Sequence, residues 1–144
     1  MLAPPTQLVS MIWGQSEVGG LQPVLRVAEA CRQRGITFHT DATQVIPQGL
    51  ISWRDHPIDL LSLSAHKLRG PRGVGLLLHR SESVPDPLQE GGGQEAGIRS
   101  GTEPVALIAG MAEAMRTLPR FDPGHQTVPP GDPLVRSQRD QLLE

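Results

Sequence analysis

The sequence predicts an α/β domain with a mostly parallel sheet and flanking helices. Short apolar runs, typical of buried strands, alternate with a stretch of helical periodicity. Polar clusters directly follow three of these runs. Glycine and proline are abundant, with 16 and 14 residues, whereas the aromatic residues are two tryptophans and two phenylalanines without a tyrosine. This composition favours a loop-rich α/β domain over a helical bundle.

The chain of 144 residues is long enough for one domain with a core of its own. Its residues are 38% hydrophobic and 19% charged, and the formal net charge is −2. A chain with this charge lacks the positive potential that attracts nucleic acid. No apolar run has the length needed to cross a bilayer, and the N-terminus lacks the pattern of a signal peptide. A single cysteine excludes an internal disulfide framework. We therefore expect a cytoplasmic protein without nucleic acid or membrane partners.

The first part of the chain is interpreted as a strand, a turn and a helix. Residues 8–13 form an apolar run that ends at a glycine-containing turn, which predicts a buried strand. Residues 23–34 place apolar side chains at helical spacing, begin with a proline and are followed by a glycine. Cys31 falls on the apolar face of this predicted helix. We expect it to be a core residue and not a reactive thiol.

Two further strands are predicted over residues 35–40 and 58–63. A strand, a helix and a strand at this spacing form a βαβ unit, whose strands are parallel. Ligands of such sheets bind at the carboxyl ends of the strands. We therefore expect the polar residues that follow the first three strands to lie along one edge of the sheet, namely residues 14–17, 41–44 and 64–67.

The next predicted element is a strand over residues 74–79, and a polar, proline-containing loop follows it. Residues 91–102 are too rich in glycine for the interior of a helix or strand. Their backbone N–H groups could cradle an anion, with Arg99, Ser100 and Thr102 as further donors. A plain surface loop is the alternative interpretation.

The chain is predicted to end in a helix, a linker and the beginning of another helix. Residues 102–118 have helical periodicity. The predicted apolar face of this helix consists of Leu107, Ile108, Met111, Ala112 and Met115. Repeated prolines and glycines in residues 119–133 predict a linker, and residues 134–144 predict the start of a truncated C-terminal helix. Residues 1–118 therefore form the predicted domain.

Lys67 is the candidate catalytic residue. It lies where a buried strand opens into a glycine-rich turn, and lysines are hardly ever fully buried without a partner. In a pocket that partly desolvates it, its amine would have a lowered pKa and form a Schiff base with an aldehyde. By itself, the string Lys-Leu-Arg-Gly-Pro-Arg is more typical of a solvated basic turn. The neighbouring polar clusters favour the catalytic interpretation.

Pyridoxal 5′-phosphate (PLP) is the aldehyde cofactor that these clusters suit. Its enzymes need a lysine, a carboxylate on the pyridine nitrogen and an anion site for the phosphate. Asp41 supplies the carboxylate, and Gln44 is placed to donate to the phenolate oxygen of the ring. Ser64 and His66 flank the lysine with donors for the phosphate.

No metal site is expected. His39 and Asp41 alternate on a strand and need not converge with His66, and no fuller set of ligands accompanies them. The glycine-containing segments after residue 13 and after residue 69 match neither a nucleophile elbow nor a Walker loop nor the dinucleotide fingerprint.

Three motifs resemble successive signatures of the cysteine desulfurases, the NifS-like branch of the class V aminotransferases. They are Asp41-Ala-Thr-Gln44, Ser64-Ala-His-Lys67-Leu-Arg-Gly-Pro-Arg-Gly-Val-Gly75 and Gly91-Gly-Gly-Gln-Glu-Ala-Gly-Ile-Arg-Ser-Gly-Thr102. Their order and spacing agree with the family, and the resemblance runs from about residue 8 to residue 118. It implies part of the large PLP-binding domain of a fold type I aminotransferase.

The resemblance also implies roles for single residues. Lys67 would form the Schiff base with PLP, Asp41 would pair with the pyridine nitrogen, and Gln44 would meet the ring oxygen. The phosphate would be bound by Ser64 and His66. In that family the threonine matching Thr102 reaches the phosphate of the other subunit, which implies a homodimer. Ser16 replaces an asparagine that contacts the cofactor in the family.

In the family, L-cysteine becomes L-alanine, and the sulfur passes through a persulfide to an acceptor protein, feeding iron–sulfur cluster or other sulfur assembly. The upstream phosphate loop and the ring-stacking histidine of the family would lie before Met1. Its sulfur-accepting cysteine and its substrate arginine would lie after Glu144. We therefore expect an incomplete family member with little or no activity alone. The alternatives are another class V aminotransferase, a selenocysteine lyase, or a non-catalytic remnant that dimerises.

Overall fold

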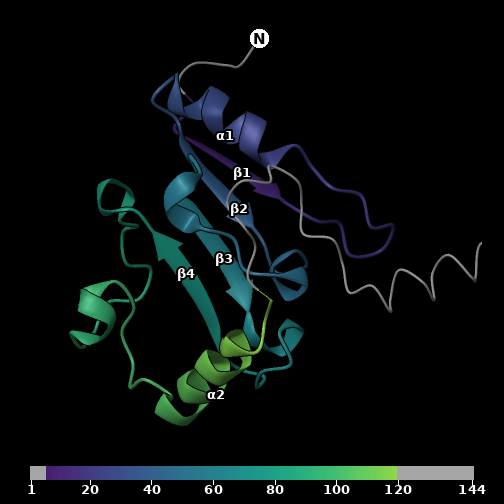
Figure 1. Cartoon of the computed structure of the whole chain (residues 1–144). Coiled ribbons are helices and arrows are strands. Elements are labelled where there is room, and N and C mark those ends of the chain that lie inside the picture. Colours follow the sequence, from purple (N-terminus) through teal and green to yellow (C-terminus); the bar gives the residue numbers. More distant parts are fainter. Residues whose placement is uncertain (1–5, 120–144) are drawn as a thin grey trace, which may run out of the picture.

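The computed structural model describes residues 6–119, which form a four-stranded sheet with two α-helices (Figure 1). The elements are β1 (Leu8–Ile12), α1 (Val24–Arg32), β2 (Thr37–Asp41), β3 (Leu60–Ser64), β4 (Gly75–His79) and α2 (Val105–Arg116). The strand order is β1-β2-β3-β4, with the first three strands parallel and β4 antiparallel to β3. The predicted α/β fold with a mostly parallel sheet is confirmed. Each predicted strand lies within two residues of its observed bounds.

Helix α1 connects β1 to β2 and packs against both strands. Pro23 precedes its first turn, and Gly35, with φ +65°, follows its last turn. A glycine suits this place because the left-handed conformation is strained for other residues. Cys31 is 5% exposed, and burial raises the pKa of its thiol. The prediction that it is a core residue is confirmed.

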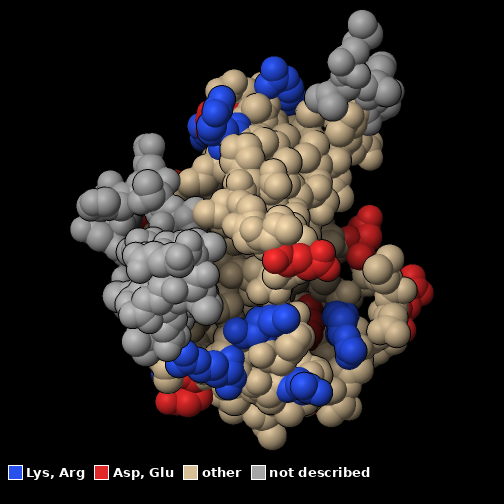
Figure 2. Space-filling view, turned by 90° about the vertical axis from the view of Figure 1, so that its right-hand side faces the viewer, with Lys and Arg blue, Asp and Glu red and all other residues tan. Residues whose placement is uncertain are grey.

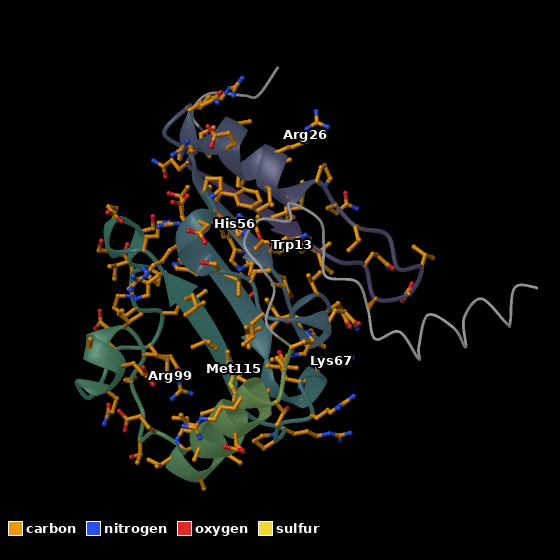
Figure 3. The ribbon with its side chains drawn as sticks, in the orientation of Figure 1. Trp13, Arg26, His56, Lys67, Arg99 and Met115 are labelled. Carbon is orange, nitrogen blue, oxygen red and sulfur yellow. The ribbon has the colours of Figure 1, made fainter. Side chains whose placement is uncertain are left out.

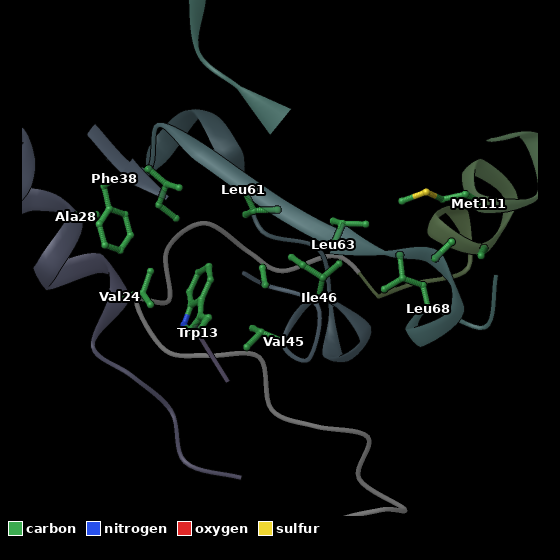
Figure 4. Packing of buried hydrophobic residues seen from close by; sticks show 14 of the residues in the cluster. Trp13, Val24, Ala28, Phe38, Val45, Ile46, Leu61, Leu63, Leu68 and Met111 are labelled. Carbon is green, nitrogen blue, oxygen red and sulfur yellow. The ribbon is translucent and has the colours of Figure 1, made fainter. Parts of the chain in front are cut away.

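The core lies on one side of the sheet (Figure 4). Alternate residues of β2 and β3 are fully buried there, because successive strand residues point to opposite faces. These are Phe38, Thr40, Leu61 and Leu63. The other buried hydrophobic residues come from α1, α2 and the connecting segments; they are Trp13, Val24, Ala28, Cys31, Ala42, Val45, Ile46, Ile58, Ala65, Leu68, Met111 and Ala114.

The opposite side of the sheet is more accessible, and we call it the open face. It includes Leu8, Ser10, Ile12, Thr37, His39, Asp41, Leu60, Ser62, Ser64, Gly75, Leu77 and His79, which share one side because of their register and alternation. Three of its apolar members are well exposed, at 53% for Leu8, 42% for Ile12 and 44% for Leu77. The open face therefore combines polar groups with uncovered apolar side chains.

Helix α2 packs against the turn that follows β3. A Cβ atom added at Gly70 would lie 3.4 Å from the Cβ of Ala114, and one at Gly110 would lie 3.2 Å from Cγ of Pro71. Among residues 6–119, no helix is long and apolar enough to cross a membrane. The predicted linker, except for its first residue, and the predicted helix at 134–144 lie outside the described residues.

The predicted apolar face of α2 is partly wrong. Met111 is buried and Leu107 and Met115 are partly buried, as predicted, but Ile108 and Ala112 are exposed. Ala114 is buried instead. The helix is apolar around most of its circumference, so its periodicity does not fix which side meets the core. It also begins at Val105 and not at residue 102, since Pro104 precedes its first turn.

Candidate cofactor site

The parallel strands bring the three predicted polar clusters to one edge of the sheet. Asp41, the last residue of β2, pairs in register with Ile12 on β1 and with Ser62 on β3. Ser64 lies two residues beyond Ser62 and therefore on the same side of the sheet. The segments that carry Ser16, Gln44 and Lys67 follow directly from these strand ends.

Asp41 keeps one carboxylate oxygen available. Its Oδ1 accepts a hydrogen bond from the backbone N–H of Thr43 at 2.9 Å, which holds the carboxylate in the turn after β2. Within residues 6–119, its other oxygen has no hydrogen-bond partner. The side chain is partly buried, and so is that of Gln44 in the same turn. An oriented carboxylate with a free oxygen suits a protonated ring nitrogen.

Lys67 lies in a short turn between two buried residues. Residues Ala65–Lys67 form a single 3₁₀ turn, in which Ala65 is buried while His66 and Lys67 are exposed. Leu68, also buried, donates its backbone N–H to the carbonyl of Ala65 at 2.8 Å. The pocket expected to desolvate the lysine is not formed by the described residues, because its side chain reaches solvent. Lys67 is also the only lysine of the sequence.

Basic side chains gather around this turn. Arg69 and Arg72 are exposed like Lys67, and Figure 2 shows several lysine and arginine side chains on the lower part of the face that holds the turn. A cluster of one charge sign concentrates ligands of the opposite sign. The surface therefore suits a ligand that carries a phosphate.

Ser16 lies in a tight turn beside the Gln44 turn. Gln15 fixes this turn, because its Oε1 accepts the backbone N–H groups of Glu17 and Val18, both at 2.6 Å. A Cβ atom added at Gly14 would lie 3.7 Å from Cβ of Gln44, so the two turns are in contact range. Ser16 itself is exposed. Sequence reasoning missed the role of Gln15, which its position before the turn glycines could have indicated.

Thr102 is not brought to this group. It is exposed and precedes α2, whereas the turn after Lys67 packs against Gly110 and Ala114, further along the helix. Figure 3 shows Lys67 and Arg99 well apart, with Met115 between them in this view. The glycine-rich loop that ends at Thr102 therefore lies away from the lysine.

Two of the predicted anion donors of the glycine-rich loop already donate hydrogen bonds to backbone carbonyls of the chain. Nη1 of Arg99 donates to the carbonyl of Ser100 at 2.7 Å, and Oγ of Ser100 donates to the carbonyl of Gln89 at 3.0 Å. Glu95 and Ala96 take positive φ values of 49° and 56°. Thr102 remains the one predicted donor of this loop without a recorded side-chain hydrogen bond among the described residues.

His39 takes part in an arrangement that sequence reasoning missed. Its Nδ1 lies 2.7 Å from Oγ of Ser10, and its Nε2 lies 3.1 Å from Oγ of Ser62. Burial lowers the pKa of its imidazole, and the negative charge of Asp41 offsets part of that shift. The alternation of these polar residues in parallel strands was the signal that could have revealed it. Within residues 6–119, no three His, Cys, Asp or Glu side chains are grouped to hold a metal.

The residues at this edge fit PLP by their chemistry. An accessible amine suits its aldehyde, a partly buried carboxylate with a free oxygen suits its pyridine nitrogen, and hydroxyl and imidazole groups among basic side chains suit its phosphate. The residues concerned are Ser16, Asp41, Gln44, Ser64, His66 and Lys67.

Comparisons with known proteins agree with this chemistry. The family model described as aminotransferase class-V matches residues 1–124. A probable mitochondrial cysteine desulfurase of Dictyostelium discoideum is 44% identical over 115 residues, which are 78% of this chain and 26% of that protein. A cysteine desulfurase of Enterobacter agglomerans is 47% identical over 113 residues, covering 78% of this chain and 28% of that protein. The chain thus spans about a quarter of the length of these curated relatives.

Solved structures show the same fold. A NifS-like protein superposes with a TM-score of 0.72 at 42% identity, covering 76% of this chain and 31% of that one. A structure described as SspA in complex with cysteine superposes with a TM-score of 0.78 at 34% identity, covering 97% of this chain and 38% of that one.

Proposed function

Because the chain belongs to the class V aminotransferase family, we propose that it carries the lysine and carboxylate part of the PLP site of a cysteine desulfurase. The observation that carries this proposal is the placement of Asp41 at the end of β2 and of Lys67 directly after the adjacent parallel strand β3, at one edge of the sheet. In the proposed reaction, the sulfur of L-cysteine moves to an acceptor thiol, which becomes a persulfide, and L-alanine remains.

Each residue has a defined task in this site. Lys67 holds the cofactor through its aldehyde carbon and moves protons with its amine, and Asp41 keeps the pyridine nitrogen protonated. When bound, PLP supplies an electron sink for bonds at the α-carbon of the substrate. Gln44 donates to the phenolate oxygen. Ser64 and His66 bind the phosphate, and the Ser16 hydroxyl contacts the cofactor where relatives of the family use an asparagine.

The sole lysine of the chain stands at the catalytic position. Twelve of the 13 basic Lys and Arg residues are arginines, since the sequence has one lysine. An arginine stays protonated at all accessible pH values and does not act as an amine nucleophile, whereas a lysine does after losing its proton. The lysine at position 67 can therefore react with an aldehyde, which the arginines of the chain do not do.

The proposed substrate is L-cysteine. The structural relative described in complex with cysteine supports it, and so do the cysteine desulfurases that resemble this chain. The proposed sulfur acceptor is a protein thiol, as in iron–sulfur cluster assembly. Other class V activities, including selenocysteine lyase and aminotransferase, share the lysine and the carboxylate and are distinguished by the product formed.

The proposal includes a homodimer, in which two copies of the chain associate near Thr102. Thr102 is exposed and lies away from Lys67, a placement that supports a contact with the phosphate in a second copy of the chain. The first turn of α2 follows directly and exposes Val105 and Ile108, at 71% and 39%. Exposed apolar side chains beside a ligand-binding loop are typical of an interface between subunits.

Borohydride trapping of PLP tests the proposal. The aldehyde of PLP condenses with the amine of Lys67 and releases one water, and borohydride then delivers a hydride to the C=N bond and gives a stable secondary amine. We expect one modified peptide, which contains residue 67, and none in Lys67→Arg. A matched control moves the lysine along the same exposed turn, as Lys67→Arg combined with Arg72→Lys.

Two results would contradict the proposal. Labelling of the moved lysine as efficiently as the native one would show that any accessible amine on this turn reacts. Labelling confined to the N-terminal amine would show that Lys67 does not bind the cofactor. Incubation with L-cysteine, with alanine, sulfide and persulfide measured separately, then distinguishes a desulfurase from other class V activities and from a non-catalytic protein that only dimerises.

A further inference from the structure

Three parallel strands are joined across the open face by a single imidazole. His39 on β2 lies 2.7 Å from the hydroxyl of Ser10 on β1 and 3.1 Å from the hydroxyl of Ser62 on β3. We call these three residues the polar ladder. Backbone hydrogen bonds already pair the strands, so the ladder adds a second, side-chain link between the same three strands.

At neutral pH, each hydrogen bond of the polar ladder has one defined donor and one defined acceptor. The pKa of His39 is lowered by burial, so the imidazole is neutral and offers one N–H donor and one acceptor nitrogen. One serine hydroxyl therefore donates to the ring, and the other accepts from it. When Nε2 is the donor, the hydroxyl proton of Ser62 is free for another acceptor.

The register places a candidate acceptor beside Ser62, although no hydrogen bond joins the two side chains among residues 6–119. Asp41 is the residue directly opposite Ser62 on the neighbouring strand and lies two residues after His39, on the same side of the sheet. Its Oδ1 is taken by the backbone N–H of Thr43, and Oδ2 has no partner within residues 6–119. Asp41 is also the charged group recorded as acting on His39 in the described part of the chain.

We propose that His39 is a positioning residue for Asp41, which it orients through Ser62 toward the pyridine nitrogen of the cofactor. The proposal rests on the function proposed above. A carboxylate at a strand end needs support from neighbouring side chains to keep a fixed direction. In this proposal the Ser62 hydroxyl, held by His39, gives that support by donating to Oδ2 of Asp41 when the cofactor is bound. Ser10 fixes the other side of the ring and so prevents the imidazole from turning away.

Substitutions at Ser62 separate positioning from simple packing. Ser62→Ala removes the hydroxyl, and Ser62→Thr keeps it on a residue that suits a strand. Thr37→Val is the control, because Thr37 lies on the same strand and the same side as His39 and its side chain forms no hydrogen bond among residues 6–119. The affinity for PLP is measured by equilibrium dialysis, and the thermal unfolding midpoint is measured without PLP.

We expect Ser62→Ala and His39→Ala to weaken PLP binding about fivefold to tenfold, the effect of losing one hydrogen bond to a charged group. Ser62→Thr and Thr37→Val should bind like the native protein. The ¹⁵N resonance of labelled PLP reports whether the ring nitrogen carries a proton. In Ser62→Ala and His39→Ala, we expect this resonance to shift toward that of the unprotonated ring. A purely structural role would lower the unfolding midpoint without moving that resonance.

A measurement without the cofactor tests the coupling by itself. Asp41→Asn removes the charge that raises the pKa of His39, so the titration of the His39 ring, followed by NMR, should shift to lower pH. An unchanged titration would overturn the proposal, and so would native PLP affinity in Ser62→Ala. A native protein that fails to bind PLP would overturn the proposed function instead, and the titration would still decide whether His39 and Asp41 are coupled.

Discussion

The guanidinium of Arg80 lies 5.3 Å from the centre of the Trp53 ring and donates hydrogen bonds to three backbone carbonyls of the same segment. The carbonyls belong to Trp53, His56 and Ile58, and the bond to Ile58 measures 2.9 Å. This single side chain therefore ties the segment before β3 to the end of β4. It lies far along the strands from the turn that carries Lys67.

Replacement of Arg80 should destabilise the fold. Arg80→Leu removes the side-chain donor of three carbonyls in a partly buried segment, and we expect the free energy of unfolding to fall by about 3 kcal/mol. Chemical denaturation measures it. Arg54→Leu is the control, because Arg54 is exposed on the same segment and should change stability by less than about 0.5 kcal/mol. Equal stability of the two variants would show that the carbonyl contacts of Arg80 contribute nothing.

Gly70 should not tolerate a side chain. A Cβ atom there would lie 3.0 Å from the carbonyl oxygen of Ala65 and 3.2 Å from its Cβ, so Gly70→Ala should lower the free energy of unfolding by about 2 kcal/mol. Gly20→Ala is the matched control, because a Cβ atom at Gly20 meets nothing within 4 Å. Thermal unfolding of both variants provides the measurement. Native stability of Gly70→Ala would mean that the Lys67 turn can move away from its contacts.

The thiol of Cys31 should make stability depend on pH in the alkaline range. Burial raises the pKa of this thiol above its ordinary value of 9.0, so the folded state binds the thiol proton more tightly than the unfolded state does. The resulting stabilisation is fully present below pH 9 and is lost as the pH rises through the pKa of the folded state. We expect the unfolding free energy of the native protein to fall more steeply above pH 9 than that of Cys31→Ala.

Two parallel pH profiles would argue against this explanation of the burial of Cys31. The comparison is direct because the two proteins differ only in this thiol, so other groups that titrate in the range contribute equally to both profiles. Alkylation by iodoacetamide at pH 8 offers a second readout, and it should be much slower in the folded protein than in urea.

A charge on the exposed side of α2 should weaken dimerisation. Ile108→Glu places a carboxylate on the exposed first turn of α2, within the proposed subunit interface. We expect the dissociation constant of the dimer, measured by sedimentation, to rise at least tenfold. Val18→Glu is the control, because Val18 is 85% exposed but lies in the turn after β1. Dissociation caused by Val18→Glu alone would place the interface at the β1 end of the sheet.

The sequence was sufficient to predict the elements that short-range signals specify. Apolar runs located all four strands, and the glycine at position 35 located the end of α1. The helical spacing of Val24, Ala28 and Cys31 placed the cysteine in the core. These features depend on residues close together in the chain, so local patterns are enough to find them.

Features that depend on distant residues could not be predicted in the same way. The side of α2 that meets the core is set by its contacts with Pro71 and Gly70, which no periodicity reveals in a helix of mainly apolar residues. His39 was considered only as a metal ligand, because its partners Ser10 and Ser62 are 29 and 23 residues away in sequence. The exposure of Lys67 also depends on packing that the sequence pattern does not specify.

The segment that carries Lys67 is fastened at both ends by paired strands. Ser64 pairs in register with Gly75, and the backbone N–H of Ala65 donates to the carbonyl of Val74 at 3.1 Å. The pairing therefore fixes where this connection leaves and re-enters the sheet, because a slip of one residue between β3 and β4 would turn every side chain of β4 to the other face. Within the connection, the backbone N–H groups of Leu68 and Gly70 both donate to the carbonyl of Ala65, at 2.8 and 2.9 Å. The backbone is thus anchored on both sides of Lys67, and the lysine side chain is the part left free to rotate toward a ligand.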